Sequence, residues 1–317
     1  MRPGAELRDG SAAAPVAEDL KPADWDGLLD AAANVMVTNR RELLRLVLAA
    51  VAVSWGLALV AALNLSQAQP ATGYQPSVGQ EGKDVVWVPT SNALVDKMLD
   101  LAAVTASDFL VDLGSGDGRT VIAAAKRGAK ALGIEYNPEL VELSRRNAAK
   151  EGIADRAAFV EGDVFETDFS KATVITLFLL QELNLRLRPK ILDMNPGVRV
   201  VSNTFDMDDW MPEQRIRISE GCTRYCTAFF WIVPAKLEGT WKMPRGELAL
   251  KQTYQMLSGT MKVGNASAVI KAGKVTGQRM TFSVGNTIYT GLVNGNTIEG
   301  VSKSPTGETQ WRATRAD

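Results

Sequence analysis

A short apolar run, Phe109–Leu113, leads directly into three glycines at alternate positions, Gly114, Gly116 and Gly118, and a helical pattern follows from Arg119. Glycine adopts positive φ without steric cost and lets a ligand approach the backbone closely. In an open α/β sheet, a turn of this kind lies at the carboxyl end of a strand, where such sheets bind ligands. The stretch therefore predicts a doubly wound α/β domain with a ligand site at the glycine turn.

The sequence around this turn alternates between helix-like and strand-like segments, which is typical of a largely parallel sheet covered by helices. Apolar periodicity predicts helices over residues 92–102 and 119–126, and Pro138 at a first turn predicts a third over 138–150. We expect a mostly parallel, seven-stranded Rossmann-like sheet over residues 85–234. Its predicted strands are 109–113, 131–135, 157–160, 172–178 and 198–203, with a closing antiparallel pair at 214–219 and 225–233.

The sequence pattern changes after Pro234, where short strand-like segments follow one another with turn residues between them. Residues 293–296, Val-Asn-Gly-Asn, are typical of a tight hairpin turn. No helical period remains in this region. Residues 235–317 are therefore expected to form a small antiparallel β meander or partial barrel.

The N-terminal part contains an uncharged apolar run at residues 46–65. About 20 such residues can span the hydrocarbon core of a membrane. Three arginines precede the run and the next Lys or Arg is Lys83, so the positive-inside rule places the following domain outside the cytoplasm. If Met36 is the true start, the same run is instead a signal sequence that ends at residues 66–68, Ser-Gln-Ala.

These observations divide the chain before the α/β domain into three parts. Residues 1–42 are expected to be a disordered basic segment. Residues 43–65 form one transmembrane anchor or signal helix, and residues 66–84 a flexible linker. The protein would accordingly be membrane-anchored or exported to the periplasm. The side of the membrane on which the α/β domain lies stays open, because the ligand inferred below is made in the cytosol.

Composition excludes several classes of site. The chain has 35 Lys and Arg against 36 Asp and Glu, so no strong overall field would draw it to nucleic acid. It has no histidine, which excludes Ser-His-Asp triads and His-ligated metals. Its two cysteines, Cys222 and Cys226, are too few for a structural zinc site. They are interpreted as small buried hydrophobes, or as a disulfide if the domain is exported.

Three acidic residues lie at or just after the carboxyl ends of three successive predicted strands. Asp112 precedes the first glycine, where it would repel a pyrophosphate but attract the ammonium and sulfonium of S-adenosylmethionine (SAM). The spacing G-x-G-x-G also departs from the dinucleotide fingerprint. Glu135 lies about 20 residues further on, where a carboxylate accepts hydrogen bonds from ribose hydroxyls. Asp163 is placed to accept from the adenine amino group, with Val164 or Phe165 against the ring.

These residues resemble the class I SAM-dependent methyltransferases over about residues 85–234. The subgroup with the mitochondrial lysine methyltransferases of the ATP synthase c-subunit and the adenine nucleotide translocase is the more similar one. The stretches that carry the resemblance are 88–90 ahead of a helix, 112–126, 133–141, 199–202 and 210–212. The cofactor-binding set that follows from the acids and the resemblance is Pro89, Thr90, Asp112, Gly114, Ser115, Gly116, Gly118, Glu135, Tyr136, Asp163 and Val164.

The methyl acceptor is less constrained than the cofactor. The resemblance implies a protein lysine, with a small molecule or an oxygen acceptor as alternatives, and a non-catalytic SAM-binding or envelope interaction protein as a further one. Residues 176–179, Thr-Leu-Phe-Leu, replace the Pro-Pro motif of adenine-N6 methyltransferases, which argues against nucleic acid. Gln181 stands where the subgroup commonly has proline.

In-line methyl transfer needs mainly proximity and alignment, so no strong base and no metal are expected. Trp210 and Trp231, which could suggest a methyl-ammonium cage, are predicted to be core residues. The candidates to orient the acceptor are Glu182, Asn184 and Asp206.

Overall fold

The computed structural model describes residues 74–316. The predicted basic segment 1–42, the anchor or signal sequence 43–65 and the first part of the linker therefore lie outside the described residues. Between residues 74 and 316, no helix is both long enough and apolar enough to cross a membrane.

A seven-stranded sheet forms the first domain, with strand order β3-β2-β1-β4-β5-β7-β6. The first five strands in this order are parallel, whereas β7 runs antiparallel between β5 and β6. Rossmann-like architecture is thus confirmed for this domain, including the closing antiparallel pair. The strands are β1 (Phe109–Leu113), β2 (Lys130–Glu135), β3 (Ala157–Glu161), β4 (Val174–Leu177), β5 (Arg199–Asn203), β6 (Gln214–Arg217) and β7 (Thr227–Ile232).

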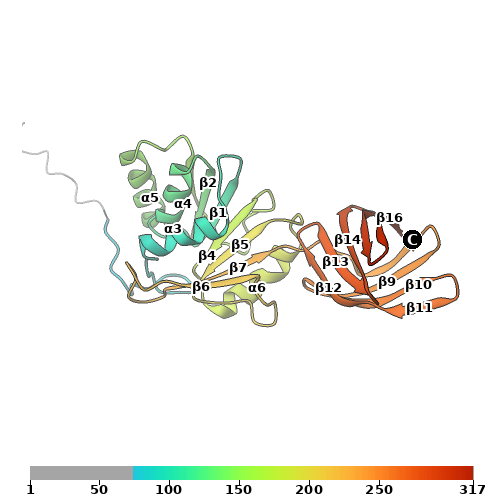
Figure 1. The fold of residues 1–317 in the computed structure, drawn as a ribbon. Helices are drawn as coiled ribbons and strands as arrows, with labels where there is room; N and C mark the ends of the chain where they lie inside the picture. Colours follow the sequence, from blue (N-terminus) through green and yellow to red (C-terminus); the bar gives the residue numbers. More distant parts are fainter. Residues whose placement is uncertain (1–73, 317) are drawn as a thin grey trace, which may run out of the picture. The chain divides into compact units, whose positions relative to one another are not determined.

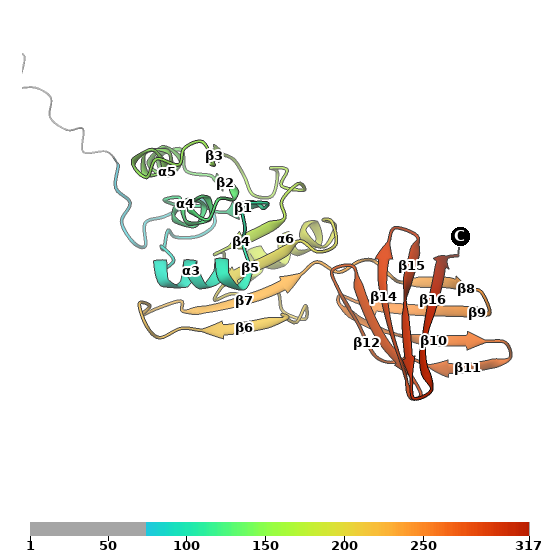
Figure 2. The same ribbon diagram turned by 45° about the horizontal axis from the view of Figure 1, so that its top comes forward.

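Helices cover both faces of this sheet (Figure 1). One apolar cluster joins α3 (Asn92–Leu101), α4 (Arg119–Lys126) and α5 (Pro138–Lys150) to one face, and Figure 2 shows α3 alongside β7. A second cluster joins α6 (Gln181–Leu192) to the other face. The order of the strands reverses between β1 and β4, which is where open α/β sheets bind ligands.

Local signals explain where the helices begin. The Ser91 hydroxyl accepts a hydrogen bond from the Leu94 amide at 3.3 Å and caps α3. The side chain of Asn137 likewise caps α5, with Pro138 at the first helical position as its sequence predicts. Trp210 and Trp231 are 1% and 0% exposed, so their prediction as core residues is confirmed.

The C-terminal strands form a closed antiparallel barrel rather than the expected meander or partial barrel. Successive strands from β12 to β16 pair with their neighbours, β16 pairs with β8, and the β9–β10 pairing closes the circle. Closure requires strands that approach closely: a Cβ at Gly259 or Gly300 would lie 1.9 Å from a carbonyl oxygen of the neighbouring strand. Trp241, Phe282 and Trp311 fill the interior. The barrel strands are β8 (Gly239–Met243), β9 (Gly246–Thr253), β10 (Met256–Val263), β12 (Lys271–Thr276), β13 (Arg279–Val284), β14 (Thr287–Asn294), β15 (Thr297–Ser304) and β16 (Gly307–Arg315), and β11 (Ala266–Val269) pairs with β10 outside the circle.

The predicted hairpin turn joins β14 and β15. Asn294 pairs with Thr297 across the hairpin, which leaves Gly295 and Asn296 as a two-residue turn. Gly295 has φ +55°, the conformation that such turns require of their central residues. The hairpin prediction is therefore confirmed.

Candidate functional site

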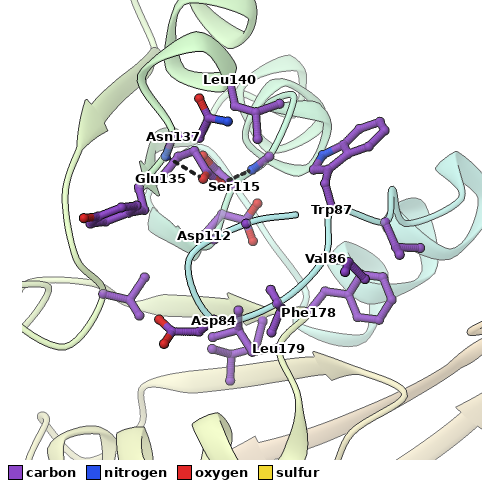
Figure 3. A pocket seen from close by; sticks show the side chains of 18 of the residues that line it. Asp84, Val86, Trp87, Asp112, Ser115, Glu135, Asn137, Leu140, Phe178 and Leu179 are labelled. Carbon is purple, nitrogen blue, oxygen red and sulfur yellow. Dashed lines mark hydrogen bonds between the residues drawn. The ribbon is translucent and has the colours of Figure 1, made fainter. Parts of the chain in front are cut away.

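A cavity of about 390 Å³ opens at the carboxyl ends of β1, β2 and β4, at the reversal of strand order. Figure 3 shows side chains from the glycine turn, from the end of β2, from residues 84–87 and from the end of β4 directed toward it. Ten members of the predicted cofactor-binding set line it. They are Pro89, Thr90, Asp112, Gly114, Ser115, Gly116, Glu135, Tyr136, Asp163 and Val164.

Gly118, the eleventh member of that set, is not among the lining residues. It precedes α4 with φ +83°, and a Cβ there would lie 2.8 Å from the Phe159 ring and 2.9 Å from Ser144. Glycine at this position therefore serves the packing of α4 and α5 against the sheet. Gly116, in contrast, faces the cavity side, where a Cβ would lie 2.8 Å from the Trp87 indole nitrogen.

Asp112 places a buried carboxyl at the end of β1. It is 6% exposed, and its Oδ1 accepts a hydrogen bond of 2.6 Å from the Thr176 hydroxyl on the neighbouring strand β4. Burial, with a smaller contribution from the nearby Glu135 and Asp117 carboxylates, raises the pKa of the Asp112 carboxyl to about 7. A cationic group entering the cavity would compensate this loss of solvation, so the site favours a ligand that carries an ammonium.

Glu135 connects the end of β2 to the glycine turn. Its Oε2 accepts from the Gly116 amide at 2.8 Å and its Oε1 from the Asn137 amide at 3.0 Å, as the dashed lines in Figure 3 mark. The Gly114 and Ser115 amides also donate to the Ile134 carbonyl, at 2.9 and 3.1 Å. The carboxylate is thereby fixed in orientation, with lone pairs remaining for a ligand hydroxyl.

Asp163 follows β3 and is engaged from two sides. Its Oδ1 accepts from the Phe165 amide at 2.8 Å, and its Oδ2 forms an ion pair with the Lys83 ammonium. Hydrogen bonding to Lys83 lowers the pKa of the Asp163 carboxyl and raises that of Lys83. Lys83 also lies 4.7 Å above the centre of the Tyr136 ring.

Residues 79–90 are called the entry segment, and residues 80–90 of it form one wall of the cavity. The sequence places residues 80–84 in a flexible linker, yet they line the site. The segment is ordered by paired backbone hydrogen bonds of 2.9 Å between residues 79–80 and Trp87. Its far end is held at Thr90, whose hydroxyl accepts from the Asn203 amide at 3.1 Å.

Arg119 ties the entry segment to the glycine turn. One terminal nitrogen donates to the Thr90 carbonyl at 2.7 Å, while Nε and the other terminal nitrogen donate to the Asp117 carboxylate at 2.9 and 2.5 Å. A planar guanidinium can make both contacts at once because its donors are arranged as a fork. The sequence marks Arg119 only as the residue after the glycines; its partner Thr90 lies 29 residues away.

None of the three predicted acceptor-orienting residues lines the cavity. Glu182 is exposed at the start of α6. Asn184 is 0% exposed, and its Nδ2 donates to the Ser202 hydroxyl at 3.2 Å and to the Phe205 carbonyl at 3.1 Å. Asp206 is half-buried and accepts from the Gln181 amide at 2.6 Å. Their part in catalysis stays a prediction.

Sequence reasoning did not single out the aromatic residues that complete the lining. Phe178 follows β4, Phe205 follows β5 and Tyr225 precedes β7. All three line the cavity. No spacing rule connects them, because the contact arises only when the ends of these strands meet. The alternation of helix-like and strand-like segments predicts the strands and therefore the edge of the sheet near which these residues lie. It does not predict their contact.

Cys222 and Cys226 form a disulfide in the loop between β6 and β7. The interpretation of the two cysteines as buried hydrophobes is therefore wrong, and the alternative, a disulfide, is confirmed. The hairpin brings the two residues together: the Ile218 amide donates to the Cys226 carbonyl at 3.0 Å. Cys222 is half-buried in the loop rather than part of a core cluster.

No cluster of three metal-ligating side chains occurs within residues 74–316. A cationic cofactor fits the residues that are present better than an anionic one would, since six carboxylates line the cavity: Glu81, Asp84, Asp112, Asp117, Glu135 and Asp163. The Ser115 hydroxyl, also in the lining, is buried and has no hydrogen-bond partner among the described residues, which leaves one polar group for a ligand.

Comparison with known proteins agrees with this geometry. Residues 112–214 match the family model described as the ANTKMT methyltransferase domain. The chain is 40% identical over 152 residues to a protein-lysine N-methyltransferase of Saccharolobus islandicus, covering 47% of this chain and 94% of that protein. It is 34% identical over 128 residues to the ATP synthase c-subunit lysine N-methyltransferase of Homo sapiens, covering 40% of this chain and 54% of that protein. The chain thus spans about half the length of the human relative.

A solved structure is also similar to part of this chain. It is an RNA methyltransferase from Salinibacter ruber in complex with S-adenosyl-L-homocysteine (SAH), 45% identical, with a TM-score of 0.45. The alignment covers 47% of this chain and 96% of that chain.

Proposed function

The chain belongs to the family of SAM-dependent methyltransferases that includes the protein-lysine N-methyltransferase of Saccharolobus islandicus, and on this premise we propose that it methylates lysine ε-amino groups of a protein. The enzyme class and the cofactor follow from that family. The acceptor is the part that we propose. Its support is the names of two relatives that are 40% and 34% identical, together with the apolar residues in the lining of the cavity.

The observation that carries the cofactor part of this function is the buried Asp112 carboxyl beside the glycine turn, with Glu135 at the end of β2 and Asp163 after β3. Asp112 would hold the ammonium of SAM, Glu135 its ribose hydroxyls and Asp163 its adenine amino group. When bound, SAM supplies an activated methyl group on a sulfonium. The remaining tasks of the protein are to align an acceptor with it and to keep water away.

The reaction needs a neutral amine, because only its lone pair can attack the methyl carbon while the carbon–sulfur bond breaks. An isolated lysine ammonium has a pKa near 10.4. Entry into a cavity lined by Leu177, Leu179 and Leu183 removes water from the ammonium and lowers that pKa. The released proton goes to solvent, so a chain without histidine is equipped for this chemistry. Glu182, Asn184 and Asp206 are proposed to orient the acceptor, directly or through the Phe205 loop.

Radiolabel transfer tests the proposed acceptor. The full 317-residue chain is incubated with SAM labelled in its methyl group and a protein extract of its source cells, followed by complete acid hydrolysis. We expect label in methylated lysine, and none with Asp112→Asn. Base-labile label would identify a carboxyl-oxygen acceptor, label released by ribonuclease an RNA, and label in low-mass material a small molecule. SAM binding without transfer to any fraction would leave a non-catalytic SAM-binding protein.

A separate proposal concerns location. We propose that the uncharged run within residues 43–65 anchors the chain in a membrane, with the arginines before it on the cytoplasmic side. The full chain should then stay in the membrane fraction after a carbonate wash and begin upstream of residue 43. A mature protein that begins at residue 69 would show instead that the run is a cleaved signal sequence.

A further inference from the structure

Three aromatic side chains form one side of the cavity, and we call them the aromatic wall: Phe178, Phe205 and Tyr225. The ring centres of Phe178 and Tyr225 lie 5.3 Å apart at 61°, an edge-to-face contact. Phe205 stacks on Phe178 at 6.3 Å and lies 6.5 Å from Tyr225. Each ring therefore touches the other two, and together they present a continuous aromatic surface.

The aromatic wall and the carboxylates occupy different halves of the cavity. Asp112 and Glu135 lie at the carboxyl ends of β1 and β2, and Asp163 follows β3; these strands lie on one side of the reversal of strand order. The rings follow or precede β4, β5 and β7, which lie on the other side. The carboxylates satisfy the polar groups of the cofactor. The aromatic half has no such partner in the cofactor and is available to the second substrate.

Tyr225 is the member of the wall that packing alone does not explain. It is 43% exposed, and its φ of +57° is a conformation that a bulky residue seldom adopts. The Cys222–Cys226 disulfide closes the loop that carries it, so the cross-link fixes the chain on both sides of this residue. On the loop's other side, a Cβ at Gly221 would lie 2.8 Å from the Ala93 side chain, so the loop packs closely against α3.

We propose that the aromatic wall is the channel for the acceptor lysine, and that the Cys222–Cys226 disulfide holds Tyr225 in place to form it. This inference rests on the proposed function and names the residues that recognise its substrate. The rings would contact the aliphatic stem of lysine and attract its ammonium through their faces before the proton is lost. A neutral side chain of the same length would gain only the apolar contact.

Binding of a blocked lysine tests the channel without knowledge of the protein substrate. The full chain is saturated with SAH and titrated with Nα-acetyl-lysine N-methylamide, observed by ligand NMR, with the norleucine analogue as the neutral comparison. We expect the lysine derivative to bind at least fivefold more tightly than the norleucine derivative. Tyr225→Ala should weaken the lysine derivative at least fivefold, and Tyr225→Phe, which keeps the ring, should weaken it less than twofold.

Tyr136→Ala provides the matched control, because Tyr136 is also an exposed tyrosine of this cavity but lies beside Glu135. It should weaken SAH and leave the lysine derivative unchanged in the saturated complex, whereas Tyr225→Ala should leave the Kd of SAH within twofold. Unchanged binding of the lysine derivative by Tyr225→Ala would overturn the channel, as would equal binding of the lysine and norleucine derivatives.

The disulfide is tested by a reductant and by the double variant Cys222→Ser with Cys226→Ser. Both should weaken the lysine derivative severalfold and leave SAH binding unchanged, and the reductant should have no further effect on the double variant. Undiminished lysine binding after reduction would overturn the role of the cross-link. If the channel binds the lysine derivative but the enzyme transfers no methyl group to protein, only the proposed function is refuted. If the enzyme methylates protein lysine and Tyr225→Ala leaves the acceptor KM unaltered, only the channel is refuted.

Discussion

Lys83 and Asp163 form an ion pair between the entry segment and the end of β3, although 80 residues separate them in the sequence. Asp163 is the acid that we assign to the adenine amino group. Its Oδ1 accepts from the Phe165 amide and its Oδ2 binds Lys83, so an adenine amino group would have to share one of these oxygens. Cofactor binding through Oδ2 must therefore displace or share the Lys83 contact.

Substitution of Lys83 tests this competition. Lys83→Met removes the ammonium and keeps most of the apolar stem, so we expect SAM to bind a few-fold more tightly. Lys97→Met is the matched control, because Lys97 forms an exposed ion pair on α3 away from the cavity and should leave the affinity unchanged. Calorimetric titration decides between the alternatives. Weaker binding by Lys83→Met would show that the ion pair holds the entry segment over the cofactor.

The pKa of Asp112 makes a prediction about pH. Because burial raises this pKa to about 7, the unliganded carboxyl is protonated below that pH and cannot form an ion pair with the SAM ammonium. SAM affinity should increase from pH 6 to pH 8. Asp112→Asn should bind weakly at every pH and remove most of this dependence. A wild-type affinity that is constant over this range would contradict the assignment.

The same pKa has the opposite consequence for the stability of the unliganded protein. The folded pKa lies above the unfolded value of about 3.9, so the folded chain binds more protons between these limits. The contribution of Asp112 to the free energy of unfolding is therefore greatest below pH 4 and is lost as pH rises through about 7. Denaturant titrations at pH 5 and pH 8 measure the free energy of unfolding of the wild type and of Asp112→Asn. The part of the difference between the two pH values that comes from Asp112 should be absent in the variant.

Arg119 should control the position of the entry segment. Arg119→Lys keeps the charge but cannot reach Thr90 and Asp117 together, so we expect a loss of about 1–2 kcal/mol in SAM binding. Amide hydrogen exchange at residues 85–90 should become faster. Arg127→Lys is the comparison, since Arg127 binds Asp96 and Asp100 on the outer side of α3. Unaltered exchange in Arg119→Lys would refute the connection.

Part of this site can be predicted from sequence because its determinants are local. Strand, glycine turn and helix follow each other between Phe109 and Lys126, and an acid at each strand end falls at a fixed place in the fold. Lys83, the Arg119–Thr90 contact and the aromatic wall are missed for the opposite reason. Each joins segments that are distant in sequence, and neither periodicity nor residue spacing reports such contacts.

The barrel shows the same limit at the level of topology. Turn residues and short strands predict an antiparallel sheet and place the Gly295-Asn296 turn correctly. Closure depends on the pairing of β9 with β10 in addition to that of β16 with β8, and on glycines such as Gly259 at close strand contacts. The sequence alone does not show which of its glycines lie opposite a neighbouring carbonyl.

Asn184 should affect the acceptor rather than the cofactor. Its buried amide donates to the Ser202 hydroxyl and the Phe205 carbonyl, so Asn184→Ala should cost about 1–3 kcal/mol of stability by leaving these groups unpaired. Because Phe205 is then less fixed, we expect the acceptor KM to rise severalfold and the Kd of SAM to stay within twofold. Chemical denaturation and steady-state kinetics measure the two effects. Glu182→Ala, at an exposed position, should change stability by less than about 0.5 kcal/mol.

We propose that the carboxylates of the site recognise SAM, and calorimetric titration of the full chain with SAM tests this most directly. The wild type should bind one equivalent, and Asp112→Ala and Glu135→Ala should each weaken binding by roughly 1–3 kcal/mol, the scale of a lost charged hydrogen bond. Absence of binding by a folded wild-type chain would contradict the account, as would affinities in both variants equal to that of the wild type.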